Sequence, residues 1–314
     1  GDTSPESPES LTAKVNTTET SVTVTAKGGR FARATSLSLP TWSENNGQDD
    51  IRWYSAKRLA SGAWTLSFPI SNHKDVGTYF VHAYGVTSGI NSWLASISFE
   101  VTAPSATFDA VSPDGSAGLV DIGFAVSAGT SKIRQVDVPV WFAEGGQDDI
   151  VWHKAELGGD GRWSVRASIA EHRFQSGRFL AHVYVRLENG AYCFAGSTED
   201  SLDVPAPVLS ASLNDAETEA AVTVSGGYLP FADPWSVTVP VWSEAGGQDD
   251  LVWYPATPSG GAWTAKVPIS RHASTGKYFA HVYAKVGGRL LFIGSTSFEV
   301  TAPSATFDAV SPDG

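Results

Sequence analysis

The chain has 314 residues, of which 42% are hydrophobic and 17% charged, and its formal net charge is −12. This composition excludes intrinsic disorder for most of the chain, and the length suits three small domains better than one. Because the negative charge repels phosphate backbones and anionic lipid surfaces, we expect no nucleic acid partner. No apolar run approaches the ~20 residues of a membrane helix, so we expect no membrane insertion.

The first ten residues, GDTSPESPES, are polar and contain no signal peptide. We interpret residues 1–9 as a linker or a cloning remnant. The single cysteine, Cys193, excludes a disulfide within the chain and is expected to be a small buried residue on a strand. The absence of methionine indicates a fragment of a longer protein.

Three segments of the chain repeat one pattern. WSENNGQDDIRWY, WFAEGGQDDIVWH and WSEAGGQDDLVWY begin at Trp42, Trp141 and Trp242, with spacings of 99 and 101 residues. Each segment is followed by GAW or GRW, and then by GTYFVHAY, GRFLAHVY or GKYFAHVY. Self-similarity at a fixed period is the signature of a tandem array. The sequence therefore predicts three copies of one β-rich unit.

The segment SFEVTAPSATFDAVSPDG at 98–115 recurs unchanged at 297–314. We therefore expect residues 301–314 to be the opening strand of a fourth repeat. The predicted divisions are repeat 1 at 10–101, repeat 2 at 102–204 and repeat 3 at 205–300. The joints TAPS and PAPV contain proline, which stiffens a linker. We expect the repeats to form an elongated, monomeric rod.

Within the first repeat, hydrophobic residues alternate along successive short segments. The first strand is expected near 11–15, and alternation continues through 21–26, 37–41, 51–53, 64–70, 79–83 and 93–101. A period of two with frequent turn signals is typical of a β-sandwich. The sequence predicts an all-β chain of seven-stranded, immunoglobulin- or fibronectin-III-like sandwiches with few helices.

The same alternation predicts which aromatic side chains enter the core. Trp53 is predicted to be buried, as immunoglobulin-type folds bury a tryptophan in mid-strand. Trp93 is predicted to share the inward face of 93–101. Tyr79 is predicted to form a tyrosine corner, in which its hydroxyl bonds back to the chain. Phe179 of repeat 2 lacks the hydroxyl for this bond, whereas Tyr278 of repeat 3 keeps it.

Aligned in this way, the WSExxGQDDIxWY, GxW and GxYxxHxY motifs resemble the Bsp-like repeat of Gram-positive surface and cell-wall-associated proteins. The resemblance covers three full units, which is nearly the whole chain. It implies an exported protein, located at the cell surface or in the cell wall. The family occurs beside peptidoglycan hydrolase domains, and the resemblance supplies neither catalytic residues nor a ligand.

An outward row of aromatic and histidine side chains is the first candidate site. If Tyr79, Val81 and Ala83 face inward, the intervening residues face outward. Such a row suits stacking on the apolar faces of sugar rings, or a protein interface. The alternative is that it packs under a loop or forms a second, minor core. The candidate ligand-binding residues and their equivalents are Trp42, Tyr54, His82 and Tyr84, then Trp141, His153, His182 and Tyr184, then Trp242, Tyr254, His281 and Tyr283.

Acidic turns and paired histidines are the next candidates. The paired aspartates at 49–50, 148–149 and 249–250, with Glu44, Glu144 or Glu244, offer too few oxygens for Ca²⁺. We therefore favour hydrogen bonds from local backbone N–H groups to the Asp side chains. A zinc site needs three or four ligands, and no cysteine accompanies the histidines, so no metal is expected. The histidine pairs are His73 with His82, His172 with His182, and His272 with His281.

A catalytic function is not expected. The sequence contains no GxSxG motif or other nucleophile context. A catalytic arrangement would also have to occur in triplicate, which is unusual for enzymes and usual for binding or spacing modules. We therefore expect no enzyme activity and no cofactor.

Two functions remain open for an extracellular protein of this kind. The first is a non-catalytic repeat region of a bacterial cell-surface protein, which acts as stalk and adhesion module. The second is a cell-wall or glycan-binding module that targets an attached peptidoglycan hydrolase. The partners would be cell-wall glycan, or a protein or glycan on a host surface.

Overall fold

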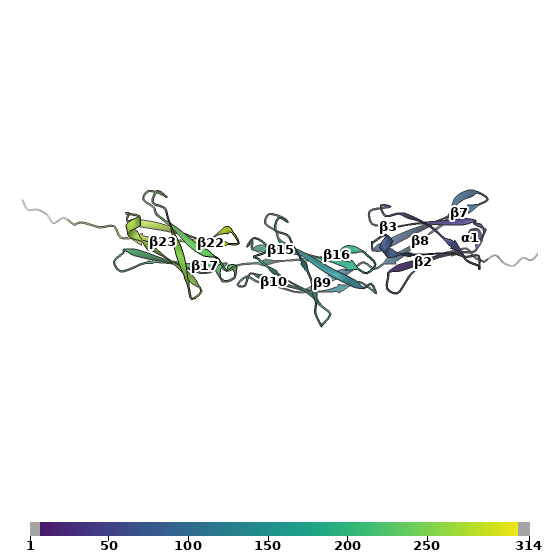
Figure 1. Cartoon of the computed structure of the whole chain (residues 1–314), viewed down its shortest axis with the longest axis horizontal. Helices are drawn as coiled ribbons and strands as arrows, with labels where there is room; N and C mark the ends of the chain where they lie inside the picture. Colours follow the sequence, from purple (N-terminus) through teal and green to yellow (C-terminus); the bar gives the residue numbers. More distant parts are fainter. Residues whose placement is uncertain (1–6, 307–314) are drawn as a thin grey trace, which may run out of the picture. The chain divides into compact units, whose positions relative to one another are not determined.

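The computed structural model describes residues 7–306 of the chain. Within this range nearly all regular secondary structure is antiparallel β-strand, arranged as three tandem Ig-like sandwiches (Figure 1). The predicted all-β fold is therefore confirmed. Residues 301–306 form no strand, and the rest of the predicted fourth-repeat strand, 307–314, lies outside the described residues, as do residues 1–6 of the predicted linker. The predicted repeat boundaries and the rod remain predictions.

Repeat 1 forms two four-stranded sheets, with orders β1-β2-β6-β5 and β4-β3-β7-β8. This is the two-sheet arrangement of immunoglobulin- and fibronectin-type domains. Its elements are β1 (Ser10–Val15), β2 (Ser21–Lys27), α1 (Gly29–Arg33), β3 (Ser36–Ser43), β4 (Arg52–Ser55), β5 (Lys57–Arg58), β6 (Trp64–Pro69), the 3₁₀ helix η1 (Ile70–Asn72), β7 (Gly77–Thr87) and β8 (Ile90–Val101).

Repeat 2 has the same pair of sheets, with orders β13-β14-β10-β9 and β12-β11-β15-β16. Its elements are β9 (Ser105–Asp114), β10 (Leu119–Ser127), β11 (Ile133–Phe142), β12 (Val151–Lys154), β13 (Glu156–Leu157), β14 (Trp163–Ser168), β15 (Gly177–Leu187) and β16 (Tyr192–Leu202).

In repeat 3 one long strand, β20, continues from one sheet into the other. The result is a single seven-stranded sheet with the order β17-β18-β21-β20-β19-β22-β23. Its elements are β17 (Pro207–Leu213), β18 (Glu219–Gly226), α2 (Leu229–Ala232), β19 (Ser236–Ser243), β20 (Val252–Ser259), β21 (Ala262–Pro268), the 3₁₀ helix η2 (Ile269–Arg271), β22 (Gly276–Val286) and β23 (Arg289–Val300).

The core of repeat 1 follows the predicted alternation on its central strands. Val22 and Val24 of β2 are fully buried, and so are Tyr79, Val81 and Ala83 of β7. Successive side chains on a strand point to opposite faces, so the residues between them lie on the outer face of each sheet. The outer face of the β4-β3-β7-β8 sheet is the surface on which the candidate site was predicted.

The predicted burial of Trp53 is wrong, because 62% of Trp53 is exposed. In the pairing of β3 with β4, Leu39 lies opposite Tyr54 and Pro40 lies opposite Trp53. Side chains directly opposite each other on paired strands share a face, and Leu39 is buried. Tyr54 therefore turns into the core and Trp53 turns outward, the reverse of the prediction.

The predicted inward position of Trp93 is also wrong. The β7–β8 register pairs Ala83 with Ala95 but Tyr84 with Trp93, so Leu94 is an extra residue on β8. A β-bulge of this kind switches the faces of the residues beyond it. Leu94 consequently lies in the core and Trp93 is half exposed.

The predicted tyrosine corner is present. The Tyr79 hydroxyl donates to the Asp75 carbonyl oxygen at 3.0 Å, and the Tyr278 hydroxyl donates to the Ser274 carbonyl oxygen at 2.8 Å. Because the acceptor is a backbone carbonyl, the change from Asp to Ser preserves the bond. Burial is the main cause that raises the pKa of Tyr79 above its ordinary value, so this hydroxyl stays a donor.

Candidate functional site

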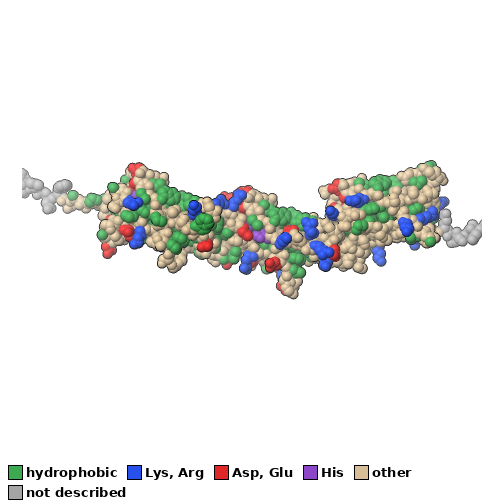
Figure 2. All heavy atoms as spheres, in the orientation of Figure 1, with side chains coloured by type: hydrophobic (Ala, Val, Ile, Leu, Met, Phe, Trp, Pro, Cys, Tyr) green, Lys and Arg blue, Asp and Glu red, His purple; other side chains and the backbone are tan. Residues whose placement is uncertain are grey.

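An aromatic band covers the outer face of β4-β3-β7-β8 in repeat 1 and of the equivalent strands in repeats 2 and 3. Its members are Trp, Tyr, Phe and His side chains from four neighbouring strands. Figure 2 shows hydrophobic side chains gathered on the visible surface of each repeat. The band consists of Trp42, Trp53, His82, Tyr84 and Trp93 in repeat 1, of Trp141, Trp152, His182, Tyr184, Tyr192 and Phe194 in repeat 2, and of Trp242, Trp253, His281, Tyr283 and Phe292 in repeat 3.

The inner part of the band is a tryptophan–histidine pair with nearly constant geometry. The Trp42 and His82 rings meet edge to face with centroids 4.8 Å apart and an interplanar angle of 78°. The equivalent pairs have the same 4.8 Å separation in repeats 2 and 3. Trp42 faces outward as predicted, but only 8% of it is exposed. This pair is therefore mainly a packed base for the rest of the band.

The outer part of the band is the one that a ligand can reach. The rings of Trp53 and Tyr84 are tilted together with centroids 5.5 Å apart, and repeats 2 and 3 have matching pairs at 5.5 and 5.6 Å. The exposed fractions of the outer tryptophans are 62% for Trp53, 55% for Trp152 and 49% for Trp253. Each repeat thus offers one exposed indole fixed against a tyrosine ring.

The bulge of the last strand adds a further exposed aromatic residue. In repeat 1 this residue is Trp93, and in repeat 3 it is Phe292, which is 52% exposed. Tyr283 pairs with Phe292 and Val282 pairs with Gly294, so Ile293 is the extra residue of the bulge and is buried. In repeat 2, Phe194 is 50% exposed and contacts both His182 and Tyr184. Neither the exposed indoles nor these residues were among the predicted site residues.

Three of the predicted site residues lie outside the band, and one of them, His153, lies beside the buried His172. Tyr54 and Tyr254 point into the core, where each hydroxyl bonds to the Nε2 atom of a buried histidine, at 3.0 Å to His73 and 2.9 Å to His272. The Tyr54 ring also stacks on Phe68 with centroids 4.7 Å apart. Their predicted outward orientation is therefore wrong, and strand pairing is the cause.

The paired aspartates behave as the turn chemistry predicts. Asp50 accepts the Ser43 backbone N–H at 2.9 and 3.2 Å and lies 3.0 Å from Nδ1 of His73. In repeat 3, Asp250 accepts the Ser243 N–H at 2.9 Å and lies 3.2 Å from Nδ1 of His272. In repeats 1 and 3 the second aspartate therefore fixes the turn to its strand and orients a core histidine.

The electrostatics of His73 follow from its place inside the sandwich. Burial lowers the pKa of His73, and the neighbouring Asp50 carboxylate only partly opposes this. The imidazole is therefore neutral at pH 7, and it links Asp50 on one side to Tyr54 on the other. We call this arrangement the Asp–His–Tyr chain; it recurs as Asp250, His272 and Tyr254.

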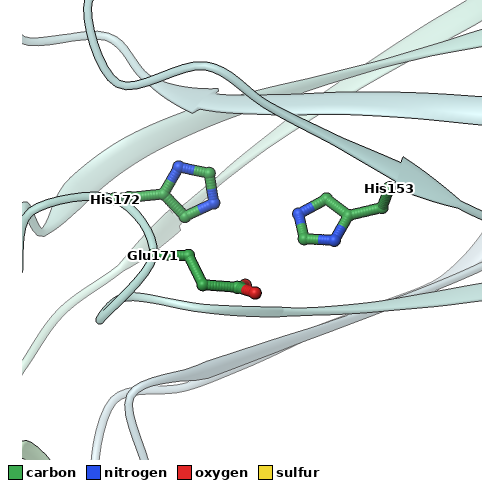
Figure 3. Close-up of side chains that lie close together, drawn as sticks. All are labelled: His153, Glu171 and His172. Carbon is green, nitrogen blue, oxygen red and sulfur yellow. The ribbon is translucent and has the colours of Figure 1, made fainter.

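Repeat 2 departs from this pattern at two positions. His153 stands where repeats 1 and 3 have tyrosine, and Glu171 stands where they have Asn72 and Arg271. One ligand-type atom each of His153, Glu171 and His172 lies within 4.8 Å of the other two (Figure 3). His182, the other histidine of the pair considered for zinc, packs against Trp141 on the outer face. Aligning the repeats column by column would have revealed the pair of substitutions.

Cys193 lies on β16 as predicted and is partly buried. Burial raises the pKa of its thiol to about 11. A thiol with so high a pKa carries almost no thiolate at pH 7, and the thiolate is the nucleophile. Cys193 is therefore a poor nucleophile at pH 7.

A family model matches the chain three times. The model is described as the GBS Bsp-like repeat, and the matches cover residues 12–98, 112–200 and 211–298. The chain belongs to the GBS Bsp-like repeat family. The resemblance seen in the motifs is thereby confirmed, and the three matches correspond to the three sandwiches. No protein among the curated ones matches these Bsp-like repeats.

Solved structures that resemble the Bsp-like repeats do so weakly. One is a tetra-tandem repeat in the extending region of a large adhesion protein, with 18% identity over 93% of this chain and 74% of that chain and a TM-score of 0.32. Another belongs to a bacterial ice-binding adhesin, with 13% identity, 94% and 98% coverage and a TM-score of 0.25. The FN1–FN3 domains of chicken CNTN1 have 10% identity, 95% and 99% coverage and a TM-score of 0.28. TM-scores this low support no inference about this chain.

The sequence predicts no membrane insertion, and the helices of the structure bear on that prediction. Between residues 7 and 306, none of them combines the length and the apolar character needed to cross a bilayer.

Proposed function

We propose that these Bsp-like repeats are a non-catalytic region of an extracellular bacterial surface protein, where they act as a stalk and adhesion module. The observation that carries the proposal is the chemistry of the two joints between neighbouring repeats. Both joints contain specific side-chain contacts in addition to the proline-containing linker. A spacer requires such contacts, because a flexible string of domains does not hold a distal domain away from a surface.

The joint between repeats 1 and 2 is organised around one buried carboxylate. Glu19, in the turn between β1 and β2, is 8% exposed. It accepts the backbone N–H of Thr102 at 2.9 Å, the Thr102 hydroxyl at 2.8 Å and the Ser131 hydroxyl at 3.0 Å. Burial would raise the pKa of Glu19, but these hydrogen bonds outweigh it and leave the pKa below its ordinary value. The carboxylate therefore ties the turn of repeat 1, the linker and repeat 2 together.

The joint between repeats 2 and 3 depends mainly on aromatic packing instead. Gly118 lies so close to the Phe231 ring that an added Cβ atom would stand 2.6 Å from it. The rings of Phe174 and Tyr228 meet edge to face with centroids 6.5 Å apart, and the Tyr228 hydroxyl lies 3.1 Å from the Ser176 hydroxyl. Side chains larger than hydrogen do not fit at Gly118, so this joint depends on shape more than on charge.

Small-angle X-ray scattering of the whole chain tests the stalk. The proposal expects the scattering of an extended monomer, and a compact particle would contradict it. Glu19→Gln should loosen the first joint, so that repeats 1 and 2 tumble more independently in ¹⁵N relaxation measurements. Glu217→Gln is the matched control, because Glu217 of repeat 3 accepts the corresponding two bonds from Thr301, which follows repeat 3, and should not affect the first joint.

The second candidate function is binding of a cell-wall or host glycan, which would target an attached hydrolase. It is favoured by the outer part of the aromatic band, with one exposed indole held against a tyrosine in each repeat. Aromatic rings of this kind stack on the apolar faces of sugars, and they are equally suited to a protein partner.

A peptidoglycan pull-down and a glycan array separate binding from spacing alone. The informative variant replaces Trp53, Trp152 and Trp253 with serine, since all three are exposed and the fold should persist. Trp235→Ser is the matched control, because Trp235 is 79% exposed and lies outside the band. Loss of binding in the triple variant only would support the band as the binding surface. Binding by neither protein, or equal binding by both, would leave the stalk as the function.

A further inference from the structure

Repeat 2 replaces the Asp–His–Tyr chain of its neighbours with a different set of side chains. In repeats 1 and 3 the Nε2 atom of the core histidine is occupied by a tyrosine hydroxyl, at 3.0 Å in Tyr54 and 2.9 Å in Tyr254. Repeat 2 has His153 in that position. It also has Glu171 directly before the core histidine, His172. Relative to repeats 1 and 3, repeat 2 therefore has an imidazole in place of a tyrosine phenol. It also has a carboxylate in place of Asn72 or Arg271.

We propose that His153, Glu171 and His172 form a binding site for a divalent transition-metal ion, with Zn²⁺ as the best fit. Their ligand atoms all lie within 4.8 Å of one another (Figure 3). In tetrahedral coordination with zinc–ligand bonds of about 2.0–2.2 Å, two ligand atoms of one ion stand about 3.4 Å apart. Side-chain adjustments that shorten these separations by up to about 1.4 Å close the set around an ion.

The choice of metal follows from the donor atoms. Two imidazole nitrogens and one carboxylate oxygen suit zinc and its neighbours in the first transition row. Ca²⁺ and Mg²⁺ prefer sites made of oxygen atoms, and two nitrogens out of three donors disfavour them. Three protein ligands leave a fourth position for water.

The surroundings give an ion both anchorage and access. His172 is fully buried, whereas Glu171 is exposed, so the set runs from the core to the surface. A cleft of about 600 Å³ opens beside His153, which lines it together with Lys154 and Arg166. A bound ion would tie β12 to the segment after β14, as the tyrosine–histidine hydrogen bond ties the corresponding segments in repeats 1 and 3.

The direct test is calorimetric titration of the whole, chelator-treated chain with ZnCl₂. The proposal expects one ion per chain, with MgCl₂ and CaCl₂ giving no comparable binding. His153→Tyr restores the residue found in repeats 1 and 3, so it should fold and should weaken zinc binding at least about tenfold. Glu171→Gln should also weaken it. Glu199→Gln is the control, since it removes a carboxylate of the same repeat outside the site, and it should bind as the parent does.

A second measurement keeps the result independent of folding defects. The double variant Tyr254→His, Arg271→Glu rebuilds the ligand set in repeat 3, and the proposal expects it to bind two zinc ions per chain. Zinc should also slow amide hydrogen exchange in β12 and at His172 in the parent, and not in His153→Tyr. The proposal is overturned if the parent binds no zinc, or if His153→Tyr binds it as tightly as the parent.

Discussion

Repeats 1 and 2 have the same sheets and the same outer band, but they stabilise their cores differently. Repeat 1 has the Asp–His–Tyr chain and the tyrosine corner at Tyr79. Repeat 2 has His153 in place of Tyr54 and Phe179 in place of Tyr79. The comparison teaches that the sandwich tolerates changes in its buried polar groups, while the outer tryptophan–histidine and tryptophan–tyrosine pairs stay within 0.1 Å in centroid separation.

The largest effect is expected from Asp50→Ala. This change leaves two buried donors, the Ser43 N–H and Nδ1–H of His73, without their acceptor. Buried donors that lose a partner cost about 1–3 kcal/mol each, so repeat 1 should lose about 3 kcal/mol of unfolding free energy. Hydrogen exchange resolved by repeat would show faster exchange at Val81 and Ala83 and no change in repeat 3. Equal acceleration in both repeats would contradict the assignment.

Tyr54→His makes repeat 1 resemble repeat 2 and should have the next largest effect. It removes the stacking on Phe68 and the hydroxyl contact to His73. We expect a loss of about 2 kcal/mol, from the smaller buried ring and the lost hydrogen bond. The measurement is again hydrogen exchange on β7, and Tyr84→His, on the outer face of the same sheet, is the control. An unchanged repeat 1 would show that the Asp–His–Tyr chain is not needed for stability.

Acidification should weaken repeat 1 by a smaller amount. The pKa of His73 is lower in the folded chain than its ordinary value of about 6.5, because the ring is buried. The unfolded chain therefore binds the proton more tightly, so this contribution is complete above pH ~6.5 and is lost as the pH falls below it. The loss is at most about 1.4 kcal/mol per pH unit. Hydrogen exchange on β7 between pH 7 and 5.5, corrected for intrinsic rates, measures it, and His73→Gln should abolish the dependence.

The smallest effect is expected from Trp53→Ser, although Trp53 lies in the most distinctive motif. The side chain is 62% exposed and contacts Tyr84 on the outer face. Exposed substitutions usually change stability by no more than about 0.5 kcal/mol. Trp42→Ala, at a residue that is 8% exposed, should cost about 3 kcal/mol in the same assay. If the two variants were equally destabilised, Trp53 would be a structural residue after all.

Much of the fold follows from local patterning. Val22 and Val24 of β2 and Tyr79 and Val81 of β7 alternate without interruption, and they are buried as alternation predicts. The tyrosine corner was also predictable, because it needs only a tyrosine a few residues after a turn. Strict periodicity within a single strand makes these assignments independent of any partner strand.

The candidate site could be predicted only in part. Trp42, His82 and Tyr84 lie on the outer face as predicted, since they flank residues whose burial was clear. Trp53 and Trp93 could not be placed, because one depends on the β3–β4 register and the other on a bulge. Both are decided by hydrogen bonding between strands, which a single strand's sequence does not record.

The sequence by itself determined the repeat, the β-sandwich class and the family, because these depend on periodicity and on motifs in a fixed order. Only the tertiary structure decided that Trp53 faces solvent and Tyr54 the core, and that His153 lies beside His172. The reason is geometric. Alternation along a strand shows that neighbouring side chains point to opposite faces of the sheet. The pairing register with the next strand determines which of these faces lies in the core.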